Sequence, residues 1–424
     1  MTHEVVNDTF EWLRGGMAGM AASFGPVRLV SALLVPVLML AVAACGGEPR
    51  PSPSSTPAQV VAGYFTEWGV YGRGFRVKNV QESGAARRLT HLKYAFGKVD
   101  DGRCAVGDPW AAYRKPIEAA DSVDGVADSA GAPLLGSFGQ LRKLKAANPR
   151  LKVLWSFGGW SGSAGFTRAA ADPAGFAASC RALINDPRWS GLFDGIDVDW
   201  EYPNACGVSC DASGPGALTA VLAALRASLG ADALITAAVP GDVGKLRATD
   251  YAGAARYANW LGAMTYDYFG ASTGPDDRRT AAHSALSAYP GIPRTAATTE
   301  STVAELLALG VPAAKVLIGV GFYGRGWTGV DGAEPGATAT GPAPGRYGKG
   351  IEDYHVLVDR CPPTGTAGGQ AYARCGAQWW SYDTPETITE KVTFARQRGL
   401  GGLFAWELSG DTPDARLLTA LSRS

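Results

Sequence analysis

Eight short apolar runs between residue 60 and the C-terminus constrain the fold more than any other feature. Amphipathic helical patterns lie between several of them, and such alternation favours parallel strands joined by helical crossovers. Eight units in about 365 residues predict an α/β fold, a (β/α)8 TIM barrel, since an open doubly wound sheet would use fewer strands. The predicted strands are Val60–Tyr64, Leu92–Phe96, Val153–Phe157, Gly195–Glu201, Leu234–Val239, Trp260–Tyr266, Val316–Phe322 and Gly402–Trp406. The predicted helices are Gly139–Ala147, Phe166–Ile184, Ala217–Leu229, Thr302–Leu309 and Pro385–Gln397.

The N-terminal segment predicts export. Residues 1–45 contain Arg28 and a 16-residue apolar run, too short for a typical membrane span but suited to a signal peptide. The sequence before Cys45 resembles a bacterial lipobox, which makes Cys45 a lipidation candidate, although ordinary signal cleavage also fits. Residues 46–59 are a Pro/Ser-rich linker, and residues 60–424 form the predicted barrel domain. We expect an extracellular protein or a cell-surface lipoprotein, with a lipid on Cys45 as its membrane anchor.

Six further cysteines predict disulfide bonds, because an even set in an exported chain is typical of a disulfide framework. Cys206 with Cys210 and Cys361 with Cys375 are the natural local pairs, which leaves Cys104 with Cys180. Sequence alone does not fix this connectivity. A zinc site is the alternative, but the four histidines do not lie at ligand spacing from the cysteines.

The charge balance limits the kinds of partner. The chain has 39 basic and 39 acidic residues, which argues against nucleic acid or an anionic membrane surface as a partner. The 12 tryptophans are compatible with sugar stacking, although tryptophans also serve cores. We expect a monomer.

The stretch from Phe193 to Pro203 carries the clearest chemical signal. Read as a strand, it places Asp197, Asp199 and Glu201 on one face, opposite the side chains of residues 196, 198 and 200. Three stacked carboxyl groups cannot all ionise at neutral pH, so at least one proton should be held and shared. A helix is disfavoured by Gly195 and the β-branched residues that follow it.

The spacing Asp194-x-x-Asp197-x-Asp199-x-Glu201 resembles the D-x-x-D-x-D-x-E signature of the family 18 glycoside hydrolases, the chitinases. In that family the 2-acetamido group of the substrate supplies the nucleophile. The resemblance implies that Glu201 is the general acid and then the base. It also implies that Asp199 holds the acetamido N–H and that Asp197 shares a proton with Asp199. Asp194 has the opposite parity and is expected to be structural.

Further segments resemble the same family. Met264–Tyr268 is similar to its M-x-Y-D segment, which implies that Tyr266 positions the acetamido carbonyl and is the fourth catalytic residue. Ser156–Trp160 is similar to its S-x-G-G motif, and Gly401–Glu407 matches the segment that holds the tryptophan of the pocket floor. For Tyr64, Phe96 and Trp68 a packing role is nearly as plausible, and for Arg325 a structural salt bridge is the alternative. The implied substrate-binding residues are Trp406, Asp267, Met264, Tyr64, Phe96, Trp68, Trp160, Ser156, Arg325 and Tyr323.

Family members often carry a small α+β insertion between strands seven and eight, and residues 325–380 resemble a short version of it. A long disulfide-tied loop is equally compatible with the composition of this stretch. Residues 354–359 could form a strand or a helix.

The resemblance predicts a chitinase that acts on chitin or chito-oligosaccharides by cutting β-1,4 bonds between N-acetylglucosamine units, with no cofactor and no metal. One alternative is an endo-β-N-acetylglucosaminidase acting on glycoprotein glycans. The other is a catalytically inactive chitin-binding lectin, but such proteins usually lack the terminal glutamate, which is present here as Glu201.

Overall fold

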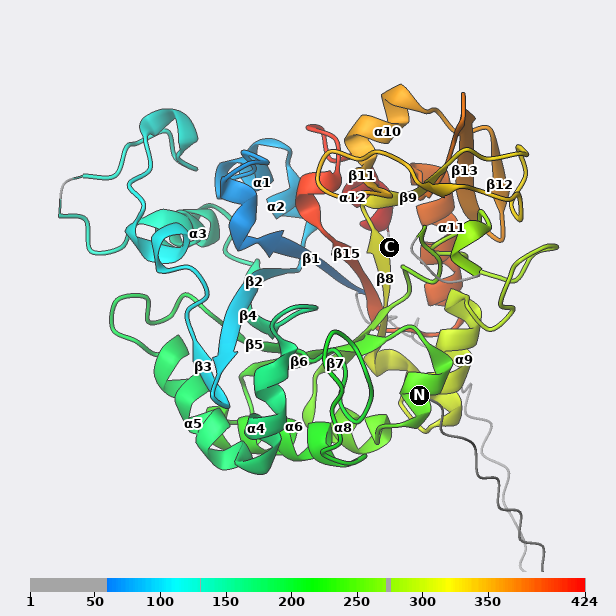
Figure 1. Cartoon of the computed structure of the whole chain (residues 1–424). Coiled ribbons are helices and arrows are strands. Elements are labelled where there is room, and N and C mark those ends of the chain that lie inside the picture. Colours follow the sequence, from blue (N-terminus) through cyan, green and yellow to red (C-terminus); the bar gives the residue numbers. More distant parts are fainter. Residues whose placement is uncertain (1–58, 130, 272–275, 424) are drawn as a thin grey trace, which may run out of the picture. The chain divides into compact units, whose positions relative to one another are not determined.

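A computed structural model describes residues 59–129, 131–271 and 276–423 (Figure 1). The predicted signal peptide, the linker as far as residue 58 and the lipidation candidate Cys45 lie outside the described residues.

A closed barrel of eight parallel strands forms the centre of the described domain, as the sequence predicted. The strands follow the order β1-β15-β8-β7-β6-β5-β4-β2, and β1 also pairs with β2, which closes the sheet. Two strands end earlier than predicted, β5 at Asp199 instead of Glu201 and β7 at Met264 instead of Tyr266. The barrel strands are β1 Val60–Thr66, β2 His91–Asp100, β4 Lys152–Gly158, β5 Gly195–Asp199, β6 Leu234–Pro240, β7 Trp260–Met264, β8 Val316–Gly321 and β15 Gly402–Trp406.

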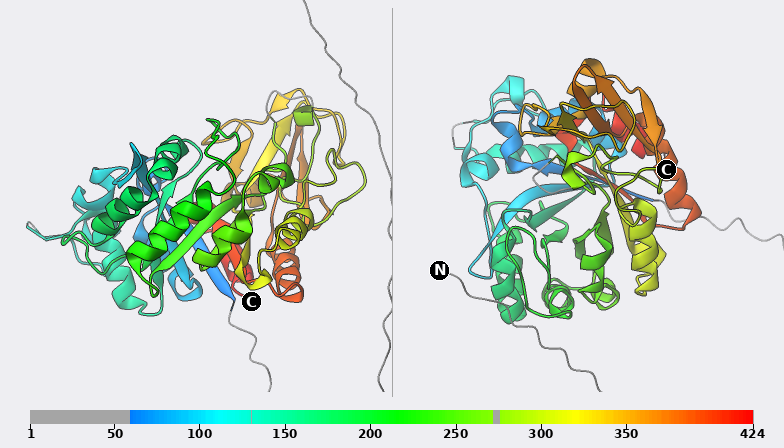
Figure 2. Two further views of the ribbon diagram at one scale, coloured as in Figure 1. Left: turned by 90° about the horizontal axis from the view of Figure 1, so that it is seen from below. Right: turned by 45° about the vertical axis from the view of Figure 1, so that its right-hand side comes forward.

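Helices lie on the outside of these strands (Figures 1 and 2). The predicted helix Phe166–Ile184 is divided into α4 and α5 at Asp172 and Pro173. The Asp172 carboxylate accepts the N–H of Gly175, and Pro173 begins the new helix, so this dipeptide starts α5 where one helix was expected. The helices are α1 Val77–Glu82, α2 Ala85–Arg88, α3 Gly136–Ala147, α4 Phe166–Ala171, α5 Pro173–Ile184, α6 Ala217–Leu229, α7 Val243–Arg247, α8 Tyr251–Tyr257, α9 Thr299–Ala308, α10 Tyr354–Arg360, α11 Pro385–Gln397 and α12 Arg416–Leu421.

Several short elements complete the barrel domain. Strand β3, Arg103–Ala105, forms a hairpin with the end of β2. Single helical turns are η1 Glu67–Val70, η2 Trp110–Arg114, η3 Ala119–Asp121, η4 Ser163–Gly165, η5 Asp276–Arg278, η6 Ala313–Lys315 and η7 Leu408–Gly410. Among the described residues, no helix is both long enough and apolar enough to cross a membrane.

The segment between β8 and β15 forms an α+β insertion and not a long loop. Its antiparallel sheet has the order β10-β9-β14-β13-β12, with β11 also paired to β9. Residues 354–359 are helical, within α10. Tryptophans 327 and 379 pack in an apolar cluster that the insertion shares with the segment after β7. The strands are β9 Tyr323–Thr328, β10 Gly341–Pro342, β11 Ile351–Asp353, β12 Gly365–Ala367, β13 Gln370–Cys375 and β14 Gln378–Tyr382.

All three predicted disulfides are present. Cys104 of β3 bonds to Cys180 of α5, and Cys361, which follows α10, bonds to Cys375 at the end of β13. The third bond joins Cys206 to Cys210 in the loop after β5, close in sequence to the three predicted acids.

Candidate active site

The strand β5 presents its acids to the inside of the barrel. Asp197 is fully buried, Asp199 is nearly so, and Glu201 follows the strand in a half-buried position. The apolar residues of the alternation point the other way, since Trp200 stacks on Phe166 of α4 with ring centroids 5.3 Å apart. The period of two therefore places the three carboxyl groups along one face, as the sequence predicted.

Four side chains donate hydrogen bonds to Asp197. Its Oδ1 accepts from Lys93 Nζ at 2.8 Å and from the hydroxyl of Thr236, and its Oδ2 accepts from Tyr64 and Ser156, each at 2.8 Å. Burial by itself raises the pKa of this carboxyl, but the Lys93 ammonium and the hydrogen bonds outweigh it and lower the pKa. Asp197 is therefore an ionised carboxylate.

Asp199 has the opposite electrostatic environment. Burial and the negative charges of Glu201 and Asp197 raise its pKa well above the ordinary range. Its Oδ1 is buried and has no hydrogen-bond partner among the described residues. No hydrogen bond links Asp199 to Asp197 in that part of the chain, where other donors occupy both oxygens of Asp197.

Glu201 holds its proton up to about neutral pH. Burial raises its pKa to about 7; Tyr202 opposes the shift, and the negative charge of Asp267 adds to it. The backbone N–H of Glu201 donates to Ser163 Oγ at 2.9 Å, which fixes the chain just after β5. A carboxyl group with this pKa can donate a proton at neutral pH and accept one afterwards.

An aromatic cluster lies beside the acids, around Trp406 at the end of β15. The Trp406 ring stacks on Phe96, with centroids 5.6 Å apart, and meets Tyr64 edge-on at 5.1 Å. Trp68 of η1 lies 6.5 Å from Trp406 and is 45% exposed. Sequence reasoning expected Trp406 at the pocket floor and left a packing role open for the other three rings, and the structure brings all four together. Tyr64 is also a direct partner of Asp197.

Residues after β7 face the first residues of the insertion. The ring of Tyr266 lies 6.3 Å from that of Tyr323, and burial and the negative charge of Asp267 raise the pKa of Tyr323. Arg325 Nε donates to Asp267 Oδ1 at 2.7 Å. Attraction to Arg325 outweighs the loss of hydration at Asp267 and lowers the pKa of that carboxyl. Met264 is almost buried and packs in the same interior cluster as Tyr64 and Tyr266.

Two glycines bring β4 close to the acids. A Cβ atom at Gly158 would lie 2.2 Å from the carbonyl oxygen of Asp199, and one at Gly159 would lie 2.5 Å from the Phe96 ring. Both glycines also have positive φ angles, of 110° and 80°. Trp160 follows them with 56% of its surface exposed, 6.4 Å from the Tyr202 ring.

Sequence reasoning missed two contacts of the site. His283 is fully buried, and its Nδ1 lies 3.7 Å from Asp267 Oδ1. Lys93 stands inside the apolar run of β2, between Leu92 and Tyr94. A lysine in a buried strand was the available signal, but the sequence does not show which acid it meets. Asp194, expected to be structural, pairs with Lys145 at 2.6 Å.

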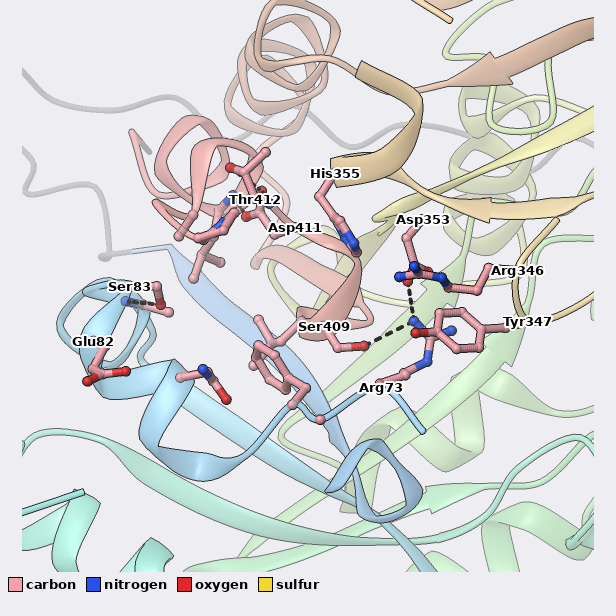
Figure 3. A pocket seen from close by; sticks show the side chains of 18 residues that line it. Arg73, Glu82, Ser83, Arg346, Tyr347, Asp353, His355, Ser409, Asp411 and Thr412 are labelled. Atoms are coloured by element: carbon pink, nitrogen blue, oxygen red, sulfur yellow. Dashed lines mark hydrogen bonds and ion pairs between the residues drawn. The ribbon is translucent and has the colours of Figure 1, made fainter. Parts of the chain in front are cut away.

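A separate cavity of about 380 Å³ lies between the segment after η1, the insertion and the segment after β15 (Figure 3). None of the predicted site residues lines it. At its edge Arg73 forms an ion pair with Asp353 of β11 and donates to Ser409 Oγ at 3.2 Å. Arg73 also lies 3.5 Å from Glu407, the residue after Trp406. The cavity therefore lies beside Arg73 and its partner Glu407, the neighbour of Trp406. It is separate from the site formed by Asp197, Asp199 and Glu201.

Comparison with known proteins places this geometry in a family. The model of the glycosyl hydrolases family 18 matches residues 60–411. The chain belongs to glycoside hydrolase family 18. Within this family it is 55% identical to Chitinase 63 of Streptomyces plicatus over 382 residues, which are 89% of this chain and 62% of that protein. It is 56% identical to Chitinase C of Streptomyces lividans over 373 residues, which are 87% of this chain and 59% of the relative. The chain thus spans about three fifths of each Streptomyces protein.

A solved family structure agrees with the fold. The catalytic domain of psychrophilic chitinase B from Arthrobacter TAD20 superposes with a TM-score of 0.80 at 32% identity. The match covers 86% of this chain and 95% of that domain. The family 18 barrel is therefore the fold of residues 60–411 and not only an expectation from the alternation of strands and helices.

Proposed function

We propose that this protein is a chitinase that hydrolyses β-1,4 bonds between N-acetylglucosamine units by substrate-assisted, retaining catalysis. One observation carries the proposal: Glu201, with a pKa of about 7, stands beside Asp199, whose buried Oδ1 has no hydrogen-bond partner among the residues that the structure describes. An acid that is protonated near neutral pH and an unpartnered acceptor beside it suit a substrate that supplies its own nucleophile.

The reaction begins at the leaving oxygen of the glycosidic bond. Glu201 donates its proton to this oxygen while the acetamido oxygen of the substrate attacks C1, and the C1–O bond breaks to give an oxazolinium intermediate. Glu201 then removes a proton from a water molecule, and the water oxygen attacks C1. The bond between C1 and the acetamido oxygen breaks, which opens the oxazolinium ring and restores the acetamido group. Asp199 Oδ1 accepts the acetamido N–H and offsets the positive charge of the intermediate. Tyr266 donates to the acetamido carbonyl and holds it in line for attack.

The remaining predicted residues hold the sugars. Trp406 provides a flat apolar floor, with Phe96 and Met264 around it, because a pyranose ring packs its apolar face on an indole. Asp267, Arg325 and Tyr323 offer polar contacts on the opposite wall. The exposed rings of Trp68 and Trp160 suit sugars beyond the scission point. Ser156 and Tyr64 act through Asp197.

We also propose that the enzyme works outside the cell, as a released protein or as a lipoprotein held by a lipid on Cys45. The three disulfides support this location, since such bonds persist in oxidising compartments.

The test is product analysis with a hexamer of N-acetylglucosamine and with solid chitin. We expect shorter N-acetylglucosamine oligomers that retain the β-configuration in the first products, together with strong inhibition by a thiazoline mimic of the oxazolinium. Cleavage of a glycoprotein glycan with no cleavage of the hexamer would point to an endo-β-N-acetylglucosaminidase. Binding to chitin without any cleavage would point to a lectin.

A further inference from the structure

The ammonium group of Lys93 is enclosed in the middle of the barrel. Both Lys93 and Asp197 are fully buried, and their charged atoms lie 2.8 Å apart. Lys93 Nζ also donates to the Tyr64 hydroxyl at 3.1 Å. The same nitrogen lies 4.7 Å from the centre of the Tyr64 ring and 5.5 Å from that of Phe404.

A lysine in this place is costly for the fold. Removing two charges from water is costly, and their mutual attraction offsets this cost only in a well-bonded geometry. The proposed hydrolysis gives this cation no step of its own, since the acids and the substrate supply the acid, the base and the nucleophile. The burial of Lys93 is therefore best explained by an effect on the neighbouring acids, Asp197 and Asp199.

We propose that Lys93 is a positioning residue of this hydrolase: it fixes a permanent negative charge on Asp197, so that the exchangeable proton of the two aspartates belongs to Asp199. This inference rests on the proposed function. With Lys93 present, Asp197 is an anchored anion and not a partner in proton exchange. Asp199 is then free to turn toward the substrate without breaking a hydrogen bond to Asp197.

The groups around Lys93 support this assignment. Strand β5 contributes Asp197 and Asp199, β1 contributes Tyr64, and Tyr266 follows β7. His91 lies two residues away on β2, and burial together with the Lys93 charge lowers its pKa to about 4, so it is neutral at neutral pH. Strands β4, β6 and β15 contribute Ser156, Thr236 and Phe404, which do not titrate. Asp194 and Lys152 act on His91 from the strand ends.

The position of Lys93 gives a selective effect on pH dependence. Its charge lowers the pKa of both Asp197 and Asp199. Burial, Tyr202, Asp267 and Lys245 perturb the pKa of Glu201, and Lys93 is not among these causes. Loss of the Lys93 charge should therefore move the acidic limb of the pH profile, which depends on the aspartates, to higher pH. The alkaline limb, set by Glu201, should move less, because Lys93 reaches Glu201 only through Asp199.

The test is the pH profile of kcat/KM on a chito-oligosaccharide for Lys93→Met. We expect the acidic limb to move upward by about one pH unit or more, the shift typical of losing an opposite charge at this distance, and the alkaline limb to move less. The matched control is Lys391→Met, because Lys391 is equally buried and pairs with Asp383 at 2.7 Å, away from the three acids. That variant should lose stability without moving either limb. An unchanged acidic limb in Lys93→Met would overturn the proposal.

A measurement on the unmodified protein covers the case in which Lys93→Met does not fold. Carbon-13 NMR of carboxyl-labelled aspartate, assigned with Asp197→Asn and Asp199→Asn, should show Asp199 titrating and Asp197 constant from pH 4 to 9. Joint titration of the two signals would overturn the inference. Because this measurement needs no substrate, it also separates the inference from the proposed function: an inactive protein with these titrations refutes only the chitinase.

Discussion

Arg325 Nε lies 2.7 Å from Asp267 Oδ1, and this ion pair joins β9 of the insertion to the segment that follows β7 of the barrel. His283 approaches the same carboxylate from a buried position. Asp267 also acts on the acids of the site, because its negative charge adds to the raised pKa of Glu201.

Replacing Arg325 by methionine should therefore impair catalysis more than folding. Asp267 would lose the partner that orients it, and we expect kcat/KM to fall about 10- to 100-fold. The melting temperature should change little, since the pair is partly exposed. Arg247→Met is a suitable control, because it removes an ion pair with Glu305 on the surface and should leave kcat/KM unaltered.

Glu201→Gln should abolish most turnover while leaving the fold intact. Glutamine has nearly the same shape but cannot protonate the leaving oxygen, so we expect kcat to drop by at least about a hundredfold. Binding of the N-acetylglucosamine hexamer, measured by calorimetry, should persist. Activity close to that of the unaltered enzyme would rule out Glu201 as the acid.

The pH dependence of kcat/KM should have an alkaline limb near pH 7. The acid must carry its proton, and burial raises the pKa of Glu201 to about 7, so activity falls as the pH rises through this value. Asp267→Asn should move the limb to lower pH, because the negative charge of Asp267 favours the protonated form. Initial rates from pH 4 to 10 check both points, and a shift to higher pH in this variant would contradict the assignment.

Glu67 should make stability depend on pH. It is buried, its Oε2 accepts from the Tyr94 hydroxyl at 2.9 Å, and burial raises its pKa from 4.5 to about 8. The unfolded chain ionises Glu67 at a lower pH than the folded chain does. The stability that the folded state gains from holding this proton is therefore fully present below pH 4.5, and it is lost as the pH rises to about 8. Glu67→Gln should thus raise the free energy of unfolding at pH 9 by roughly 1 to 3 kcal/mol, with little change at pH 4. Urea unfolding at both values tests this, and an equal effect at the two would speak against it.

The three disulfides should differ in their contribution to stability. Cys104–Cys180 joins residues 76 positions apart and Cys206–Cys210 joins residues four apart. Since a longer closed loop loses more entropy in the unfolded chain, removing the first bond by double alanine substitution should cost about 4 kcal/mol and removing the second about 2. Guanidinium unfolding of the two double variants would show the order, and a reversed order would exclude the loop-entropy explanation.

The barrel and the line of acids were predictable because both depend on local patterns. The alternation around Asp197 and Asp199 specifies which side chains share a face, and this needs no knowledge of the neighbouring strands. The split of the predicted helix at Asp172 could also have been predicted, since an aspartate before a proline is a common start of a helix.

The proton distribution was not predictable in the same way. Lys93 and Asp197 are 104 residues apart in the chain, and their ion pair exists only because β2 and β5 both border β4 in the closed barrel. Like-charge repulsion alone suggested a shared proton. The four donors on Asp197 come from four different strands, which a local sequence pattern does not bring together. Arg73 was missed for the same reason, because its partners Asp353 and Glu407 lie in distant segments.

Arg73 ties the insertion to the barrel from outside the carboxyl site. It reaches Asp353 of β11 and Glu407, the neighbour of Trp406, from the segment after η1. Shortening the insertion would remove Asp353 as a partner of Arg73. Glu407 would then be the remaining carboxylate of these two to balance the charge of the arginine. The insertion is therefore not an exchangeable accessory, and grafting it between related barrels requires carrying along the loop after the first strand.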